Sequence, residues 1–159
     1  MENRNKELHA LVCPSTFPNE LVIYYGSQTG NAEKFAHVLD EEAHTLHINS
    51  RVVDLEKFNP EEFCTHKLSI LVIATHYEGD PTDNAKTFHK WLKNSVKNNP
   101  EEKLLNNMEY CVMGLGDTSY EQFNEMAIFC DKSLNQLGAK RHHAIGAANA
   151  ETYTTEDDF

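Results

Sequence analysis

Residues 21–36 read LVIYYGSQTGNAEKFA, and this stretch decides the fold. The first part, Leu21 to Gly26, is a short apolar run stopped by a glycine, which is typical of a parallel strand covered on both faces. A helical pattern begins directly after it, because Ala32, Phe35 and Ala36 start an apolar stripe with three- and four-residue steps that continues to Leu46. The stretch therefore predicts a strand, a tight turn and a helix.

The same alternation continues along the chain. Further strands are predicted at about 48–55, 68–75, 110–115 and 141–145, and apolar helical stripes run over 85–96 and 126–137, with Gly138 as a C-terminal stop. Alternating strands and helices predict a doubly wound α/β fold whose parallel sheet carries helices on both faces. We expect residues 1–20 to be an N-terminal extension and 21–159 to form one domain.

The segment after the last predicted strand, GAANAETYTTEDDF (146–159), shows no amphipathic helix. Because a doubly wound sheet needs helices on both faces, we expect one face near the C-terminus to lack its cover. Either the chain is a fragment of a longer protein, or a partner in a larger assembly covers that face.

The composition narrows the functional classes. The formal net charge is −11, from 25 acidic and 14 basic residues, which argues against nucleic acid as a ligand and permits docking of basic partners. No run approaches the roughly 20 apolar residues of a membrane span, and the first twenty residues do not resemble a secretory signal. We expect a soluble cytoplasmic protein, with any membrane association made through a partner.

The cysteines and histidines do not suggest a metal site. Cys13, Cys64, Cys111 and Cys130 are far apart without a CxxC pair, and Cys111 and Cys130 fall in apolar strand and helix patterns. Buried small side chains explain them better than a disulfide framework. The nine histidines show no HExxH spacing, so we interpret them as surface or core residues rather than ligands.

The first strand–helix loop, GSQTGN (26–31), has the composition of a phosphate site. Its glycines allow a tight turn, and the N–H groups at the following helix N-terminus can converge on one anion. It contains no lysine and fits neither GxxxxGK[ST] nor GxGxxG, which favours a terminal monophosphate over a triphosphate with magnesium. The alternative is an ordinary N-capped turn.

Two more loops leave strands at the same sheet edge, where doubly wound proteins bind ligands. In THYEGDPTDN (75–84), His76 or Tyr77 can form the wall for a flat ring, and Asp83 or Asn84 can cap the next helix. In GLGDTSYEQFN (114–124), Tyr120 can cover a ring face. The alternatives are a turn with incidental aromatics and ordinary packing of Tyr120 and Phe123.

These loops resemble the FMN domain of the diflavin reductase family, whose nearest type is NADPH–cytochrome P-450 reductase. YGSQTGNAEKFA (25–36) is similar to the family's YGSQTGTAEEFA, ATHYEGDPTDNA (74–85) to ATYGEGDPTDNA, and GLGDTSYEQFN (114–124) to GLGNKTYEHFN. KSLNQLGAKR and the closing TEDDF also match in kind, so the resemblance runs from about Leu21 to Phe159.

The resemblance implies a flavodoxin-like sheet of five parallel strands in the order 2-1-3-4-5, with FMN at its edge. It implies no catalytic side chain and a set of cofactor-binding residues: Ser27, Gln28, Thr29, Gly30, Asn31, Ala32, Ala74, Thr75, His76, Tyr77, Leu115, Gly116, Asp117, Thr118, Ser119, Tyr120, Glu121, Gln122, Phe123, Asn124 and Asn149.

The sequence departs from the family pattern at several of these positions. His76-Tyr77 stands where the family has Tyr-Gly, and tyrosine resists the positive φ that glycine tolerates. GAANA (146–150) replaces the usual GLGDD, Asn31 replaces a threonine, and the final helix expected after TEDDF is missing.

The resemblance also implies partners. In such reductases electrons pass from NADPH to FAD to FMN and then singly to a haem protein. This chain shows no counterpart of the FAD or NADPH modules, so we expect it to be the output end of that relay. Glu156, Asp157 and Asp158 resemble acidic residues that dock basic acceptors.

Two alternatives to this electron-transfer function stay open. The first is a flavodoxin-like subunit with lost or weakened flavin binding that serves assembly. The second is a free-standing flavodoxin that acts as a diffusible carrier.

Overall fold

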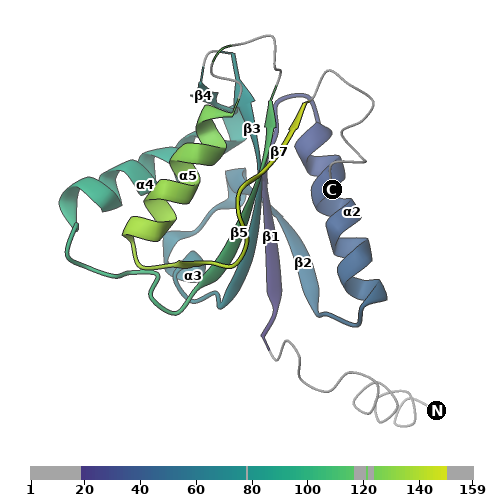
Figure 1. The fold of residues 1–159 in the computed structure, drawn as a ribbon, viewed down its shortest axis with the longest axis horizontal. Coiled ribbons are helices and arrows are strands. Elements are labelled where there is room, and N and C mark those ends of the chain that lie inside the picture. Colours follow the sequence, from purple (N-terminus) through teal and green to yellow (C-terminus); the bar gives the residue numbers. More distant parts are fainter. Residues whose placement is uncertain (1–18, 78, 117–120, 122–123, 150–159) are drawn as a thin grey trace.

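The protein is described here by a computed structural model that covers residues 19–77, 79–116, 121 and 124–149. Its sheet has the strand order β2 (Ser50–Asp54), β1 (Leu21–Gly26), β3 (Leu68–His76) and β5 (Glu109–Gly116), all parallel (Figure 1). Beyond β5 lie two short strands, β6 (Lys140–Arg141) and β7 (Gly146–Asn149), which both pair with it in parallel. The predicted order 2-1-3-4-5 is confirmed, with the fifth position shared by β6 and β7.

The bounds predicted for the last strand were wrong. Residues 142–145, all of the predicted strand except Arg141, separate β6 from β7. The backbone N–H of His142 still donates to the carbonyl of Tyr110 at 2.8 Å, but the backbone N–H of His143 hydrogen-bonds the side chain of Cys111 instead of continuing the ladder. The physical reason is polarity: both imidazoles are exposed, where a continuous strand would place alternate side chains against the sheet face.

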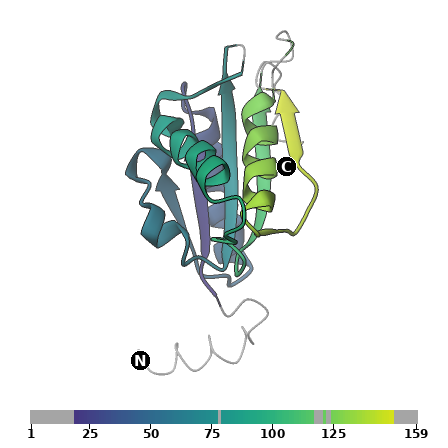
Figure 2. The same cartoon turned by 90° about the vertical axis from the view of Figure 1, so that its left-hand side faces the viewer.

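Helices cover the two faces of the sheet unequally. α2 (Asn31–Thr45) packs on one face, and α4 (Lys86–Asn98), α5 (Glu125–Gln136) and the short α3 (Pro60–Phe63) lie on the other (Figures 1 and 2). Short 3₁₀ turns, η1 (Leu55–Lys57) and η2 (Asp83–Ala85), follow β2 and β4 (Asp80–Pro81). The predicted stop at Gly138 is confirmed, since this glycine has a φ of 95° just after α5.

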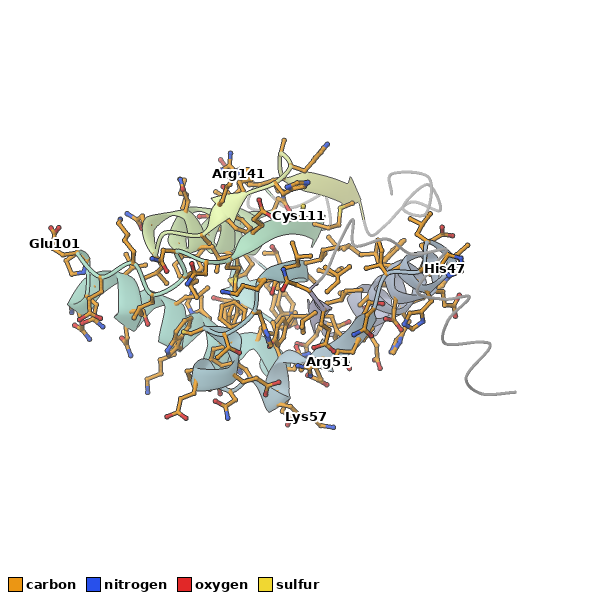
Figure 3. The ribbon with its side chains drawn as sticks, turned by 90° about the horizontal axis from the view of Figure 1, so that it is seen from below. His47, Arg51, Lys57, Glu101, Cys111 and Arg141 are labelled. Atoms are coloured by element: carbon orange, nitrogen blue, oxygen red, sulfur yellow. The ribbon has the colours of Figure 1, made fainter. Side chains whose placement is uncertain are left out.

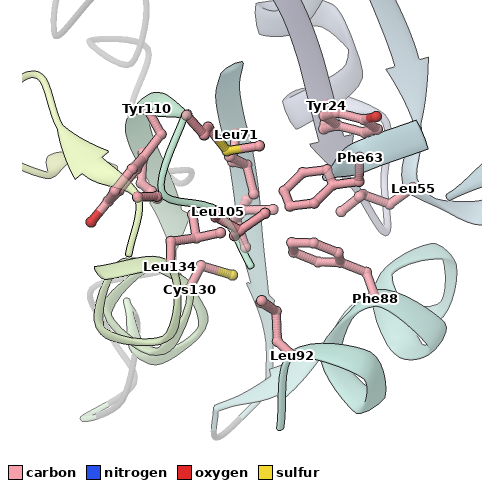
Figure 4. Close-up of a cluster of buried hydrophobic side chains, with 14 of the residues drawn as sticks. Tyr24, Leu55, Phe63, Leu71, Phe88, Leu92, Leu105, Tyr110, Cys130 and Leu134 are labelled. Carbon is pink, nitrogen blue, oxygen red and sulfur yellow. The ribbon is translucent and has the colours of Figure 1, made fainter. Parts of the chain in front are cut away.

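The larger core fills the space between the sheet and α4 and α5. Figure 4 shows aromatic rings from β1, α3 and α4 (Tyr24, Phe63 and Phe88) gathered beside Leu71, Leu105 and Leu134. Cys130 is fully buried in this core, as its place on the predicted apolar stripe indicated, and burial raises the pKa of its thiol to about 12. The core anchors the strands whose carboxyl ends carry the candidate site.

The opposite face is only partly covered. α2 packs over a smaller cluster that includes Ile23, Phe35 and Val72. At the amino ends of the strands, a hollow of about 220 Å³ is lined mainly by apolar side chains, among them Leu21, Ile70 and Cys111. Within the described part of the chain, α2 is the helix that packs on this face. The expected lack of cover near the C-terminus concerns residues that lie mostly outside the described part of the chain.

Seen from below in Figure 3, Cys111 lies on β5, beside the outer edge that carries Arg141, and Arg51 marks the other edge. Among the described helices, none has both the length and the apolar character needed to cross a membrane.

Candidate functional site

The carboxyl ends of β1, β3 and β5 lie side by side, because these strands are neighbours in a parallel sheet. Thr75, at the end of β3, accepts a hydrogen bond from the backbone N–H of Met126 at 3.2 Å, which ties the start of α5 to this edge. The loop after β1 is joined to the loop after β3 by side-chain hydrogen bonds described below. The structure therefore brings together the described parts of the loops that the sequence singled out.

The loop after β1 leaves a helix N-terminus open. Gly30 is the N-cap of α2, has a φ of 95°, and α2 has no side-chain cap. The first intrahelical bond runs from the N–H of Lys34 to the carbonyl of Gly30, so the N–H groups of the first turn have no partner within the helix. A Cβ at Gly30 would meet nothing within 4 Å. N–H groups without a partner inside the helix, a favourable dipole and open space fit an anion such as a phosphate.

The side chain of Ser27 shapes this loop from within. Its Oγ accepts the N–H of Gly30 at 2.9 Å, which closes a local turn across residues 27–30. A hydroxyl that accepts one hydrogen bond keeps its own O–H as a donor. Ser27 therefore still has one donor to offer to a ligand.

The second loop is bonded to the first. Gln28 donates to Asp83 Oδ2 and accepts the backbone N–H of Asp83, both at 3.0 Å, and Asn84 Oδ1 accepts the N–H of Ser27 at 3.0 Å. A hydrogen bond from Lys86, and then one from Gln28, lower the pKa of the Asp83 carboxyl. The predicted capping by Asp83 or Asn84 was wrong: α4 begins after Ala85 with no side-chain cap, because both side chains bond to other partners.

Tyr77 adopts the backbone conformation that the sequence analysis expected it to resist. Its φ is 48°, and Gly79 has a φ of 109°. The cause is the antiparallel pairing of β3 with β4, which sets Thr75 opposite Pro81 and His76 opposite Asp80 and leaves a tight turn between them. The Tyr77 ring contacts the His76 ring at a centroid distance of 3.9 Å, yet Tyr77 is 64% exposed and therefore points largely into solvent.

The end of β5 is shaped by close packing against α5. A Cβ at Gly114 would collide with Asn124 Oδ1 and lie 2.7 Å from the Cβ of Ala127, so only glycine allows this approach. Asn124 Oδ1 is itself buried and has no hydrogen-bond partner within the described part of the chain. A buried acceptor left without a donor at the candidate site is a position that a donor from a ligand can satisfy.

The predicted site residues divide into three groups. Some lie at the carboxyl edge with exposed or half-buried positions: Ser27, Gln28, Thr29, Gly30, Asn31, Ala74, Thr75, His76, Tyr77, Glu121 and Asn124. Ala32, Leu115 and Gly116 are buried, and the backbone of Asn149 on β7 pairs in register with Gly116. The rest lie outside the described residues: Asp117, Thr118, Ser119, Tyr120, Gln122 and Phe123, as do Glu156, Asp157 and Asp158.

Sequence reasoning missed Asp54 and Thr82. Asp54 ends β2, and its carboxylate accepts hydrogen bonds from Asn84 at 3.0 Å and from the Tyr25 hydroxyl at 3.1 Å. Thr82 is fully buried and donates to Asn84 at 2.7 Å. A carboxylate directly after the apolar pair Val52-Val53 is the signal in the sequence that could have pointed to Asp54.

The fold and the site together define a class: a doubly wound α/β protein with an open helix N-terminus at the carboxyl edge of its sheet. Comparison with known proteins makes the class specific, since the chain matches the Flavodoxin family over residues 23–159 and belongs to it. FMN, the cofactor expected from the sequence, agrees with this membership, and the open N-terminus of α2 fits its phosphate.

Proteins similar to this chain in sequence include reductases. An NADPH–cytochrome P-450 reductase of Musca domestica is 40% identical over 144 residues, which are 87% of this chain and 20% of that protein. One of Dictyostelium discoideum is 39% identical over 138 residues, 86% of this chain and 20% of that protein. The chain thus spans about a fifth of the length of these relatives.

Solved structures agree on the fold. An oxidised flavodoxin 2 from Bacillus cereus superposes with a TM-score of 0.72 at 23% identity, covering 87% of this chain and 91% of that one. A mutant flavodoxin from Pseudomonas aeruginosa gives 0.73 at 20% identity, covering 87% and 90%.

Proposed function

We propose that this chain binds one FMN at the carboxyl edge of its sheet and passes single electrons from a reductase flavin to a haem protein or a similar acceptor. The observation that carries the proposal is the uncapped N-terminus of α2 behind Gly30, beside loops bonded into one edge. Bound FMN supplies a ring that accepts and releases electrons one at a time.

Different residues are proposed to bind the phosphate and the ring of FMN. The N–H groups of the first turn of α2, with the hydroxyls of Ser27 and Thr29, hold the phosphate without a metal ion or a lysine. The end of β3, with His76 and Tyr77, lies on one side of the ring, and the segment from Leu115 to Asn124 lies on the other. This assignment follows the family resemblance of the three loops.

The partners follow from the relatives and from charge. The relatives are named NADPH–cytochrome P-450 reductases and are more than four times as long as this chain, so the proposed donor is an FAD- and NADPH-binding reductase module. The formal charge of −11 favours an acceptor with a basic face, because opposite charges speed association at low ionic strength.

Flavin titration tests the cofactor. Apo protein titrated with FMN is expected to quench flavin fluorescence with one site per chain, and riboflavin, which lacks the phosphate, is expected to bind more weakly. Absence of any bound flavin at micromolar protein and FMN would sink the proposal.

Electron delivery is tested separately. After anaerobic photoreduction of the loaded protein, a basic haem protein such as cytochrome c is expected to be reduced, more slowly as salt screens the charges. A rate that stays flat from low to high ionic strength would contradict the acidic docking surface.

A second function, a flavodoxin-like subunit with weakened flavin binding that serves assembly, is favoured by one observation. The apolar hollow on the α2 face lies at the amino ends of the strands, away from the proposed flavin site. This function predicts a stable complex with a larger partner whether or not flavin is present. A monomer that binds FMN and delivers electrons without such a partner would exclude it.

A further inference from the structure

One side-chain amide joins the ends of two strands to the loop beyond a third. Asn84 lies in η2, and its Oδ1 accepts the N–H of Ser27 at 3.0 Å and the hydroxyl of Thr82 at 2.7 Å. Its Nδ2 donates to Asp54 Oδ1 at 3.0 Å and to the carbonyl of Tyr25 at 3.3 Å. Asn84 thus bonds to the end of β1, to the end of β2 and to its own loop.

All four partners require the same orientation of the amide. Ser27 N–H and Thr82 O–H are donors and need the oxygen, whereas the Tyr25 carbonyl and the Asp54 carboxylate are acceptors and need the nitrogen. Asparagine matches these four partners, because its amide offers two N–H donors and one oxygen that can accept two hydrogen bonds, on a short side chain. Removing it leaves several polar groups at a half-buried position without partners, which is costly.

The contact matters for Ser27. Its N–H is taken by Asn84 and its Oγ accepts from Gly30, so both ends of the turn across 27–30 are fixed. The backbones of the two loops are also in close contact: a Cβ at Gly26 would come within 3.1 Å of the Ala85 Cβ and 3.2 Å of Thr82 Oγ1. The loop that leads into the open N-terminus of α2 cannot shift unless Asn84 and its neighbours shift too.

We propose that Asn84 is a positioning residue for the phosphate-binding loop. Through Ser27 it holds residues 27–30 in the conformation that exposes the N–H groups of α2, before any ligand binds. The inference rests on the proposed FMN function and deepens it, because it assigns preorganisation of the phosphate half of the site to a side chain that does not itself contact the ligand. It follows that Asn84 affects recognition of the phosphate more than recognition of the ring.

The sharpest variant is Asn84→Asp. It keeps an oxygen for Ser27 and Thr82, removes the donor to Tyr25, and sets a second carboxylate against Asp54. The matched control is Asn94→Asp, which makes the same change at an exposed position of α4. Dissociation constants for FMN and riboflavin are measured for both variants and the wild type, with thermal unfolding of each apo protein.

The expected result is a selective loss. Asn84→Asp weakens FMN binding by about tenfold or more, equivalent to roughly 1.4 kcal/mol, while riboflavin binding changes by less than about threefold. Asn94→Asp matches the wild type with both ligands. FMN affinity equal to that of Asn94→Asp, or equal losses for FMN and riboflavin, would overturn the inference.

A second variant covers the case in which Asn84→Asp does not fold. Thr82→Val replaces the buried hydroxyl that orients the amide by a methyl group of similar size, and the same selective loss of FMN over riboflavin is expected at smaller magnitude. Unchanged FMN affinity in folded Thr82→Val would contradict the inference. The wild type separates the two ideas: if it binds no FMN, the proposed function fails, whereas binding by the wild type without a selective loss in the variants refutes the positioning role alone.

Discussion

The two faces of the sheet are built from the same strands and are stabilised in different ways. On the face under α4 and α5, the side chains of Leu71, Ile73 and Tyr110 are at most 1% exposed and belong to the larger core. On the α2 face, Ile70 and Met113, from the same two strands, are only partly buried at the margin of a smaller cluster. Adjacent residues of one strand therefore experience different environments.

The difference shows that covering helices, not strand composition, set the burial of a sheet face. Along β3 the sequence SILVIA is apolar at almost every position, and alternate residues face opposite sides. Where α4 and α5 pack, those side chains leave water; on the α2 face at the amino ends of the strands, they line a hollow.

The two isoleucines of β3 provide the largest test of this comparison. Ile73→Ala is expected to lower the free energy of unfolding by about 2–5 kcal/mol, because Ile73 is fully buried and its loss leaves a cavity. Ile70→Ala removes the same atoms at the margin of the hollow and is expected to cost less than half as much. Urea denaturation of both variants measures the difference, and equal losses would show that the two faces are equally well covered.

A buried polar contact on the α4 and α5 face gives the next largest effect. The hydroxyl of Tyr110 donates to Asp131 Oδ1 at 2.9 Å, and Arg141 also hydrogen-bonds the Asp131 carboxylate, joining β5, α5 and β6. Burial, followed by the Asp131 carboxylate, raises the pKa of Tyr110 to about 12. Tyr110→Phe is expected to lower the free energy of unfolding, measured by urea denaturation, by roughly 1.5 kcal/mol, the value of a hydrogen bond to a charged group.

The matched control for Tyr110→Phe is Tyr25→Phe. Tyr25 faces the α2 side, and its hydroxyl donates to Asp54 at 3.1 Å in a part-buried position. Tyr25→Phe is expected to lower the free energy of unfolding by less than Tyr110→Phe, because water can replace the tyrosine hydroxyl as a partner of Asp54 more readily. A loss at Tyr25 as large as that at Tyr110 would argue that solvent access does not separate the faces.

Much of this fold could be predicted, and the reasons are local. The first strand, Leu21–Gly26, was predicted at its observed bounds because a glycine ends an uninterrupted apolar run there. The last strand was not, because Arg141 to Ile145 looked like a strand candidate while His142 and His143 are exposed in the structure and interrupt it. Periodicity reports which residues can be buried, and it does not report which tertiary partner buries them.

The candidate site shows the same limit. The loop composition predicted an anion site at residues 26–31, and the structure adds an uncapped helix N-terminus that fits this prediction. The role of Asn84 could not be read from the sequence, because its partners Ser27 and Asp54 lie 57 and 30 residues away. Capping is a short-range rule, so it assigned Asn84 to the nearest helix and missed these long-range bonds.

The pH dependence of stability provides a further test on the α4 and α5 face. His66 is 8% exposed, its Nε2 lies 2.7 Å from the Tyr24 hydroxyl, and burial lowers the pKa of His66, with Arg51 adding to the decrease and Glu62 and Glu20 opposing it. The unfolded chain therefore binds a proton near pH 6.5 that the folded protein resists. The contribution of His66 to the free energy of unfolding is expected to be fully present above pH 6.5. It is expected to decrease as the pH falls below that value, by at most about 1.4 kcal/mol per pH unit.

Urea denaturation at pH 7.5 and 5.5 measures this slope. His66→Gln is expected to flatten it, leaving the share of His89, whose pKa burial also lowers. His143→Gln, at an exposed position between β6 and β7, is expected to keep the wild-type slope. A slope that survives His66→Gln unchanged would remove His66 as its source.

The smallest expected effect is at the carboxyl end of β3, where Tyr77 adopts the positive φ that tyrosine resists. A φ of 48° costs a non-glycine residue roughly 1 kcal/mol, and the β3–β4 pairing holds Tyr77 there regardless. Tyr77→Ala and Tyr77→Gly both lose the contact with the His76 ring, but only glycine relieves the backbone. Because glycine also makes the unfolded chain more flexible, we expect Tyr77→Gly to be more stable than Tyr77→Ala by up to about 1 kcal/mol. Thermal unfolding of the two variants decides the point: if the alanine variant is the more stable, the turn does not hold residue 77 in the left-handed region in solution.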